Sequence, residues 1–166
     1  FVAGGIGRGE IILKFLQLGA AGCQIGTRFV CANESIAHSK FKNIFIKSEA
    51  RNAQISVKID DRLPVIPVRA IENSATQNFI SEQKKLINLV EKKEISLKDA
   101  QLSIEHFWAG SLKKAVIDGD VESGSLMAGQ SVSLVKKLQS VSEIFNELTQ
   151  QMKSQINFEQ KDSNNG

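Results

Sequence analysis

Two glycine-bearing turns carry the residues of this sequence that are best suited to chemistry. Gly4-Gly5 follows the apolar run 1–3, and Gly26-Thr27 follows a second short apolar run. Glycine lets backbone N–H groups come close to a phosphate monoester because it has no Cβ, and the Thr27 hydroxyl adds a donor. The two turns therefore predict a phosphate site on adjacent loops. The same glycines would also suit tight turns alone, and the residues by themselves leave both interpretations open.

The elements that must position these turns follow from the pattern around them. A short apolar strand over 1–3 precedes helical spacing of apolar residues over 10–18, and a second strand follows over 22–25. Gly19 stands where a helix C-cap belongs. Strands that alternate with helices at this pitch are typical of parallel βα units. The predicted fold class is therefore α/β.

The rest of the chain is predicted to be mostly helical. Apolar spacing predicts helices over 34–50 and 78–92. Between them lies an irregular strand-like stretch over 55–71, which Pro64 and Pro67 interrupt.

Helix starts and the end of the chain have their own signals. Ser96 resembles an N-cap, and Ser140 with Glu143 has the residue types of a capping box. The tail over 157–166 is polar, and its composition predicts that it is disordered.

Several side chains that often take part in catalysis have a structural interpretation here. His38 lies on a predicted helix without a clear acid–base partner, and His106 and Trp108 flank an expected helix junction, where packing is the preferred role. Cys23 and Cys31 are expected to be buried as small apolar residues.

The charged candidates lead to similar interpretations. Arg28 and Arg69 could reach a ligand phosphate, but pairing with a carboxylate is the default expectation for both. Asp118, Asp120 and Glu122 lack compact ligand spacing around the turn at Gly119, so no metal site is predicted.

Composition excludes several classes of function. The 166 residues carry a formal net charge of +3, with lysine pairs spread along helical patterns, so no nucleic-acid partner is expected. No apolar stretch reaches the ~18 residues of a membrane span, so no membrane partner is expected. Two cysteines suit neither a disulfide framework nor a zinc site, which favours a reduced, cytoplasmic setting.

Several longer motifs resemble one enzyme family. The segments are Ala3-Gly4-Gly5-Ile6, Leu18-Gly19-Ala20-Ala21-Gly22, Gln24-Ile25-Gly26-Thr27-Arg28-Phe29, Glu34 to Lys42, Pro67-Val68-Arg69, Gly110 to Val116 and Gly119 to Gln130. In order and spelling they resemble the nitronate monooxygenase family, which also holds FMN-dependent enoyl-ACP reductases. The likeness runs from residue 1 to about residue 150.

The resemblance implies a fold and a cofactor. The chain would be the C-terminal part of a TIM (β/α)₈ barrel followed by a mostly helical extension. Residues 1–30 would form the last two βα units of the FMN-binding barrel, and 31–156 a helix-rich region of the same domain, before the tail at 157–166. The family positions that contact FMN correspond here to Gly4, Gly5, Gln24, Ile25, Gly26, Thr27, Met127, Ala128, Gly129 and Gln130. In this comparison Gly5, Gly26 and Thr27 hold the phosphate, and 127–130 return toward the flavin ring.

The sequence also departs from the family pattern. Arg8 stands where the family usually has Asp, so contacts of that carboxylate are not expected here. The family's catalytic histidine lies on an earlier strand, upstream of Phe1. The chain is therefore expected to be part of a longer protein, unable to bind FMN by itself, and its catalytic residue is unknown.

The resemblance leaves the activity open between three alternatives. The first is oxidation of nitronates by dioxygen, and the second is reduction of an enoyl thioester with NAD(P)H. The third is a non-catalytic piece without turnover. A homodimer of the full-length form is also left open.

Overall fold

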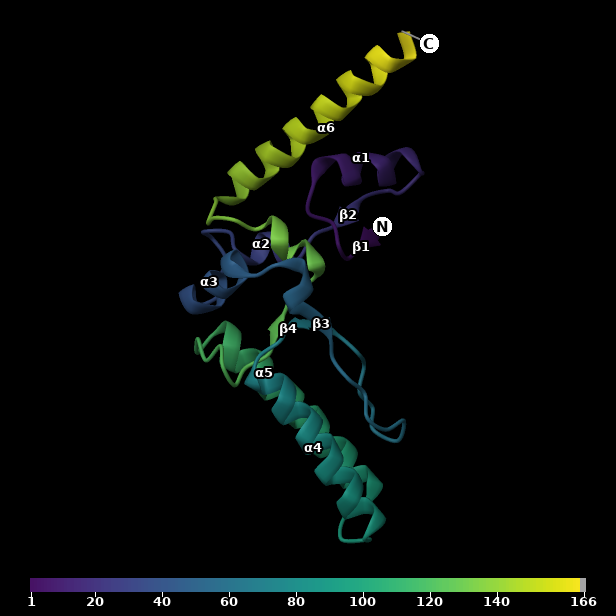
Figure 1. The fold of residues 1–166 in the computed structure, drawn as a ribbon, viewed down its shortest axis with the longest axis vertical. Helices are drawn as coiled ribbons and strands as arrows, with labels where there is room; N and C mark the ends of the chain where they lie inside the picture. The colour runs from purple at the N-terminus through teal and green to yellow at the C-terminus, as the bar shows by residue number, and fades with distance from the viewer. Residues whose placement is uncertain (165–166) are drawn as a thin grey trace.

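The computed structural model describes residues 1–164 of the chain (Figure 1). Its elements in chain order are β1 (Val2–Ala3), α1 (Gly9–Gln17), β2 (Cys23–Gln24), α2 (Thr27–Val30), α3 (Ser39–Lys47), the 3₁₀ helix η1 (Ala50–Asn52), β3 (Ala53–Ile55), β4 (Arg69–Ile71), α4 (Ser74–Glu91), α5 (Leu97–Val116), β5 (Leu126–Met127), the 3₁₀ helix η2 (Gln130–Leu134) and α6 (Val141–Asn164). None of the helices within 1–164 combines the length and the apolar character needed to cross a bilayer.

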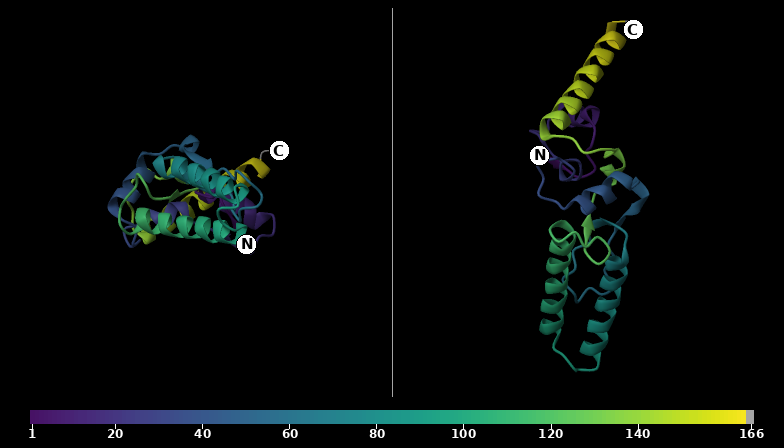
Figure 2. Two further views of the ribbon diagram at one scale, coloured as in Figure 1. Left: turned by 90° about the horizontal axis from the view of Figure 1, so that it is seen from below. Right: turned by 90° about the vertical axis from the view of Figure 1, so that its left-hand side faces the viewer.

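The molecule is elongated, with its two small sheets in the middle. Figures 1 and 2 show the α4–α5 hairpin extending from one end and α6 from the other. The elements at the two turns of interest, β1, β2 and α2, lie in the central part, close to the segment that carries η2. Residues far apart in sequence therefore meet at the centre.

The two predicted βα units are present. β1 and β2 pair in parallel, with Val2 opposite Cys23 and Ala3 opposite Gln24. Between them α1 ends at Gln17, and two residues later Gly19 has a φ of +94° and its N–H donates to the carbonyl of Leu16 at 3.0 Å. Only a residue without Cβ adopts this left-handed conformation readily, so Gly19 stops the helix as predicted.

A second sheet was only partly anticipated. β3, β4 and β5 form an antiparallel sheet in that order. Of the stretch 55–71, which was predicted to be irregular and strand-like, only the two ends belong to strands of this sheet. The intervening loop carries Pro64 and Pro67, which cannot donate to a ladder. Gln83 on α4 fixes this loop: its Nε2 donates to the Val57 carbonyl at 2.9 Å, and its Oε1 accepts from Ile59 N–H at 3.0 Å.

The α4–α5 hairpin confirms two predictions and corrects another. α4 covers the helix predicted over 78–92 but begins earlier, because Asn73 accepts from Thr76 N–H in a capping box. Ser96 caps α5 as predicted, accepting from Asp99 N–H at 3.1 Å. His106 and Trp108 lie inside α5 rather than at a helix junction. The two helices enclose an apolar cluster: Leu63, Val65, Phe79, Leu86, Ala100 and Ile104.

Two further boundaries differ from prediction. The helix expected over 34–50 is shorter, since α3 begins after His38, whose Nδ1 accepts from Lys40 N–H at 3.2 Å. The tail expected to be disordered is helical through Asn164, as part of α6; residues 165–166 lie outside the described chain.

Long-range contacts explain the length of α6. Its first turn has the predicted capping box, in which Ser140 Oγ accepts from Glu143 N–H at 3.2 Å and Glu143 accepts from Ser140 N–H at 2.6 Å. Farther along, Glu159 accepts from Lys14 Nζ at 2.6 Å and from Gln17 Nε2 at 2.9 Å. These contacts with α1 stabilise a polar helix that local composition alone does not favour.

Candidate functional site

The two glycine turns present backbone N–H groups that have no partner. Gly4 and Gly5 have φ values of +92° and +69°, a conformation that disfavours residues with Cβ. A Cβ built at Gly4, Gly5 or Gly26 would meet no atom within 4 Å. Within residues 1–164, the N–H groups of Gly5, Gly26 and Thr27 donate no hydrogen bond to protein. Unpartnered donors beside open space are the features that an anion site requires.

These turns enclose a cavity of about 200 Å³, called here the glycine cavity. Its lining consists of Gly4, Gly5, Ile6, Gln24, Ile25, Gly26, Thr27, Gly129 and Ser131. The parallel register of β1 and β2 explains the convergence, because both strands end at the same edge of the sheet. Seven of the ten residues predicted as a site lie on this one cavity.

The C-terminal loop joins this cavity through specific hydrogen bonds. Gly129 N–H donates to Thr27 Oγ1 at 2.9 Å, across more than one hundred residues of sequence. Ala128 N–H donates to the Arg69 carbonyl at 3.1 Å. A Cβ at Gly129 would lie 3.3 Å from Thr27 Oγ1, so the close approach depends on glycine.

A second cavity of about 290 Å³ adjoins the first, and we call it the Arg69 cavity. It is lined by Gly26, Thr27, Val30, Arg69, Met127, Ala128 and Gly129. Gly26, Thr27 and Gly129 are common to both cavities. Met127 and Ala128, predicted to return toward a bound cofactor, therefore line a cavity that shares three residues with the glycine cavity.

One predicted residue lies outside, and others were missed. Gln130 is exposed and lines neither cavity; it begins η2, and the next residue, Ser131, faces the glycine cavity instead. Sequence reasoning also missed Ile6 and Val30 as lining residues, although both adjoin the predicted motifs. The sequence suggested Arg69 as a possible phosphate ligand. Its position became clear only from the antiparallel sheet, in which it lies opposite Ile55.

Arg28 takes the structural role that was its default expectation. Its side chain is 6% exposed and forms a 2.6 Å ion pair with Glu147. It also donates to the carbonyl of Leu134 at 2.5 Å and to Gln139 Oε1 at 2.8 Å. Arg28 thus joins α2 to η2 and α6, and it lines neither cavity.

Arg8 is engaged at the surface. It forms a 2.7 Å ion pair with Glu10, and this pairing lowers the pKa of the Glu10 carboxyl and raises the pKa of Arg8. Arg8, where the resemblance leads to the expectation of an aspartate, therefore contacts its own helix start and does not line either cavity.

The remaining candidates are structural. The His38 ring packs against Gly119, where any Cβ would collide with it. Cys31 is buried as expected, and burial raises the pKa of its thiol to about 11; Cys23 is only half-buried. Among the described residues, no three His, Cys, Asp or Glu side chains are grouped so as to hold a metal ion.

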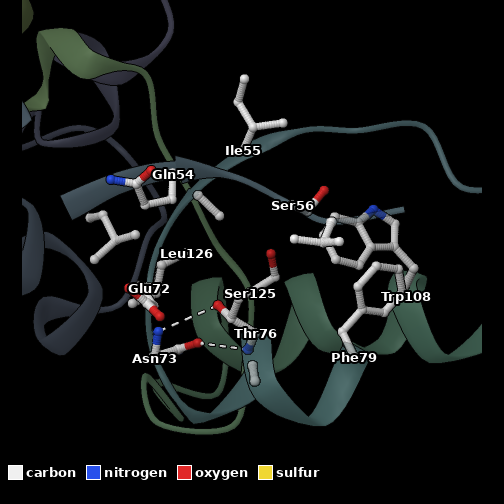
Figure 3. A pocket seen from close by; sticks show the side chains of 14 residues that line it. Gln54, Ile55, Ser56, Glu72, Asn73, Thr76, Phe79, Trp108, Ser125 and Leu126 are labelled. Carbon is white, nitrogen blue, oxygen red and sulfur yellow. Dashed lines mark hydrogen bonds between the residues drawn. The ribbon is translucent and has the colours of Figure 1, made fainter. Parts of the chain in front are cut away.

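A third hollow lies beside the antiparallel sheet and is too small for a cofactor. Figure 3 shows Asn73 and Thr76 bonded to each other at its base, with the rings of Phe79 and Trp108 along one side, tilted against each other at a centroid distance of 4.7 Å. Its volume is about 30 Å³, enough for about two water molecules. Its role is therefore packing around the start of α4.

Solved structures provide a first set of comparisons. FabK from Thermotoga maritima is 27% identical with a TM-score of 0.72, over 96% of this chain and 45% of FabK. A nitroalkane oxidase from Streptomyces ansochromogenes is 22% identical with a TM-score of 0.60, over 92% of this chain and 38% of that protein. The enoyl reductase domain of MlnA from Bacillus amyloliquefaciens is 12% identical with a TM-score of 0.70, over 95% of this chain and 48% of that domain.

The chain spans less than half the length of each of these structures. The likeness to the last two shows shared α/β fold only. No curated protein sequence matches significantly. The family model for nitronate monooxygenase matches residues 1–151. This match covers both glycine turns and the loop at Met127–Gly129, and the chain belongs to the nitronate monooxygenase family, whose members are flavin-dependent oxidoreductases.

Proposed function

We propose that the intact protein binds FMN non-covalently and oxidises nitronates with dioxygen, with this chain supplying the phosphate site. The observation that supports this proposal most directly is that Gly5, Gly26 and Thr27, whose N–H groups have no hydrogen-bond partner within residues 1–164, all line the glycine cavity. On this proposal β1 and β2 are the last two strands of a (β/α)₈ barrel, the fold in which such loops commonly hold phosphate.

The residues present fit a phosphate monoester. Backbone N–H groups suit its oxygens, and a hydrogen bond to a charged group is worth about 1.5–3 kcal/mol. Thr27 Oγ1 accepts from Gly129, which leaves its own hydroxyl hydrogen free to donate. Within residues 1–162 no carboxylate lines the glycine cavity, so no like charge would repel the phosphate.

The division of labour follows from these contacts. FMN, when bound, supplies the redox chemistry, accepting electrons from the substrate and passing them to dioxygen. The glycine turns would hold its phosphate. Met127–Gly129 line the neighbouring cavity, and the hydrogen bond from Gly129 to Thr27 holds this segment against the glycine turn. The catalytic base is assigned to no residue of this chain.

Enoyl thioester reduction with NAD(P)H is the second candidate. The observation that favours it is the likeness to FabK, an enoyl-ACP reductase, at 27% identity. Both candidates need the same phosphate site. Assays of the intact protein with a nitronate and dioxygen, and with an enoyl thioester and NAD(P)H, distinguish them. If the intact protein turns over neither substrate, the third alternative, a chain without catalytic activity, is favoured.

The phosphate site is tested by Gly26→Val in the intact protein. A Cβ at Gly26 meets no protein atom within 4 Å, so a valine there should leave the fold intact. Its branched side chain would occupy space in the cavity and block the ligand. FMN content should fall more than tenfold, because at least one charge-assisted hydrogen bond is lost. The flavin content is measured from the absorbance of the purified protein.

The matched control is Gly110→Val. Gly110 on α5 is also exposed and meets no atom within 4 Å, but it lines neither cavity. This variant should keep its full FMN content. Equal flavin content in Gly26→Val and the wild type would refute the assignment of the phosphate site.

A further inference from the structure

Arg69 is held rigidly at the wall of its cavity. It is the first residue of β4 and lies opposite Ile55 of β3. Its carbonyl accepts from Ala128 N–H at 3.1 Å, and its Nη1 donates to the carbonyl of Ala53 at 2.6 Å. The backbone and one guanidinium nitrogen are therefore both anchored.

The charge of Arg69 has no partner in the described chain. Arg8, Arg28 and Arg62 each form an ion pair with a carboxylate, whereas no carboxylate within residues 1–162 forms one with Arg69. Its one side-chain hydrogen bond, to Ala53, uses one of five N–H donors. A half-buried guanidinium with most of its donors free is suited to bind an anion.

The rest of the Arg69 cavity is mainly apolar. Val30, Met127 and Ala128 line it together with the glycine turn. The cavity thus combines one planar cation with an aliphatic wall in a volume of about 290 Å³. A ligand that matches both has a planar oxyanion at one end and a short alkyl group at the other.

We propose that Arg69 is the substrate-recognition residue that binds the two oxygens of a nitronate, while Val30, Met127 and Ala128 contact its alkyl group. This inference rests on the proposed function and names the charge that selects the substrate. A guanidinium presents parallel N–H donors to a planar oxyanion and favours it over a neutral molecule of the same shape. Arg69 therefore gives the site its preference for the nitronate anion over the neutral nitroalkane.

The test measures binding of nitrate, a planar oxyanion that needs no turnover, to the intact FMN-loaded protein. Titration calorimetry on the wild type, Arg69→Gln and Arg69→Lys gives the dissociation constants. Arg69→Gln should bind nitrate at least tenfold more weakly than the wild type. Arg69→Lys keeps the positive charge but loses the parallel N–H donors, so its dissociation constant should lie between those of the wild type and Arg69→Gln. The KM for a nitronate should rise at least tenfold in Arg69→Gln, with a smaller change in kcat.

Arg62→Gln is the matched control, because Arg62 pairs at the surface with Asp60 and Glu91 and lines neither cavity. It should bind nitrate as the wild type does. Flavin content and melting temperature are measured for every variant. Should Arg69→Gln not fold, Arg69→Lys alone decides: nitrate affinity and nitronate KM equal to those of the wild type overturn the proposal.

The outcomes separate this inference from the proposed function. Equal nitrate binding by the FMN-loaded wild type, Arg69→Gln and Arg69→Lys overturns the role of Arg69 alone. FMN-loaded protein that neither binds nitrate nor oxidises nitronates also overturns it and favours the enoyl substrate. Purified protein that cannot be loaded with FMN refutes the proposed function itself.

Discussion

Cys31 and Cys23 differ in their exposure, and this difference predicts different reactivity. Burial raises the pKa of the Cys31 thiol to about 11. The thiolate is the reactive form, so at pH 8 only about 0.1% of Cys31 is reactive. Brief treatment of the intact folded protein with iodoacetamide should modify the half-buried Cys23 and leave Cys31 unmodified. Peptide mass spectrometry measures the two extents of labelling.

The same pKa gives a pH dependence of stability. The thiol has an ordinary value of 9.0, so the unfolded chain releases this proton at lower pH than the folded protein. The contribution of Cys31 to the unfolding free energy is therefore full below pH 9 and is lost as the pH rises toward 11.

The control for the iodoacetamide prediction is labelling in urea, where both cysteines should react equally. Equal labelling in the folded protein would contradict the burial of Cys31.

Residue types predicted which glycine and threonine residues lie at the glycine cavity better than they predicted the other lining residues. Gly5, Gly26 and Thr27 could be recognised because a phosphate needs glycine and hydroxyl donors directly after strands. Ser131 could not, because its place depends on the Gly129–Thr27 hydrogen bond, which joins segments distant in sequence. Gln130 was preferred for its functional group, but the turn into η2 leaves it exposed.

The contact between α1 and α6 depends on Gly9. A Cβ at Gly9 would overlap the Leu148 carbonyl and lie 2.8 Å from Gln151 Cβ. Gly9 N–H also donates to Gln151 Oε1 at 2.7 Å. Gly9→Ala should push α6 away and destabilise the intact protein by about 1–3 kcal/mol, the usual cost of overpacking.

Gly110→Ala provides the comparison for that prediction. Its Cβ would enter open space on α5, and alanine is up to about 1 kcal/mol more favourable than glycine inside a helix. Thermal unfolding should show a lower melting temperature for Gly9→Ala and an unchanged or higher one for Gly110→Ala. Equal melting temperatures would show that α6 does not pack on α1 as described.

Local signals predicted elements, and long-range contacts decided their extent. The caps at Ser96 and Ser140 and the stop at Gly19 were predicted because each depends on residues within one helical turn. The last turns of α6 were missed because Lys14 and Gln17, far away in sequence, bond to Glu159. The sheet β3-β4-β5 was incompletely predicted for a similar reason, since β5 has two residues and pairs with a strand more than fifty residues earlier.

The glycine cavity forms where three segments that are distant in the sequence meet. The turns after β1 and β2 supply donors, and the loop after β5 closes the cavity through Gly129. Arg28 stabilises the same arrangement because its hydrogen bond and ion pair join α2 to η2 and α6. The chain spans 45% of the length of FabK, so the rest of the proposed flavin site would come from other parts of the intact protein.

On the proposed function, the glycine cavity binds the phosphate of FMN. Riboflavin has the same ring system without the phosphate, so the ratio of the two dissociation constants isolates the cavity's contribution. Titration of the flavin-free intact protein, followed by flavin fluorescence, should show FMN binding more than tenfold tighter than riboflavin. Gly26→Val should abolish most of that preference by weakening FMN binding alone. Riboflavin binding as tightly as FMN in the wild type would contradict the account.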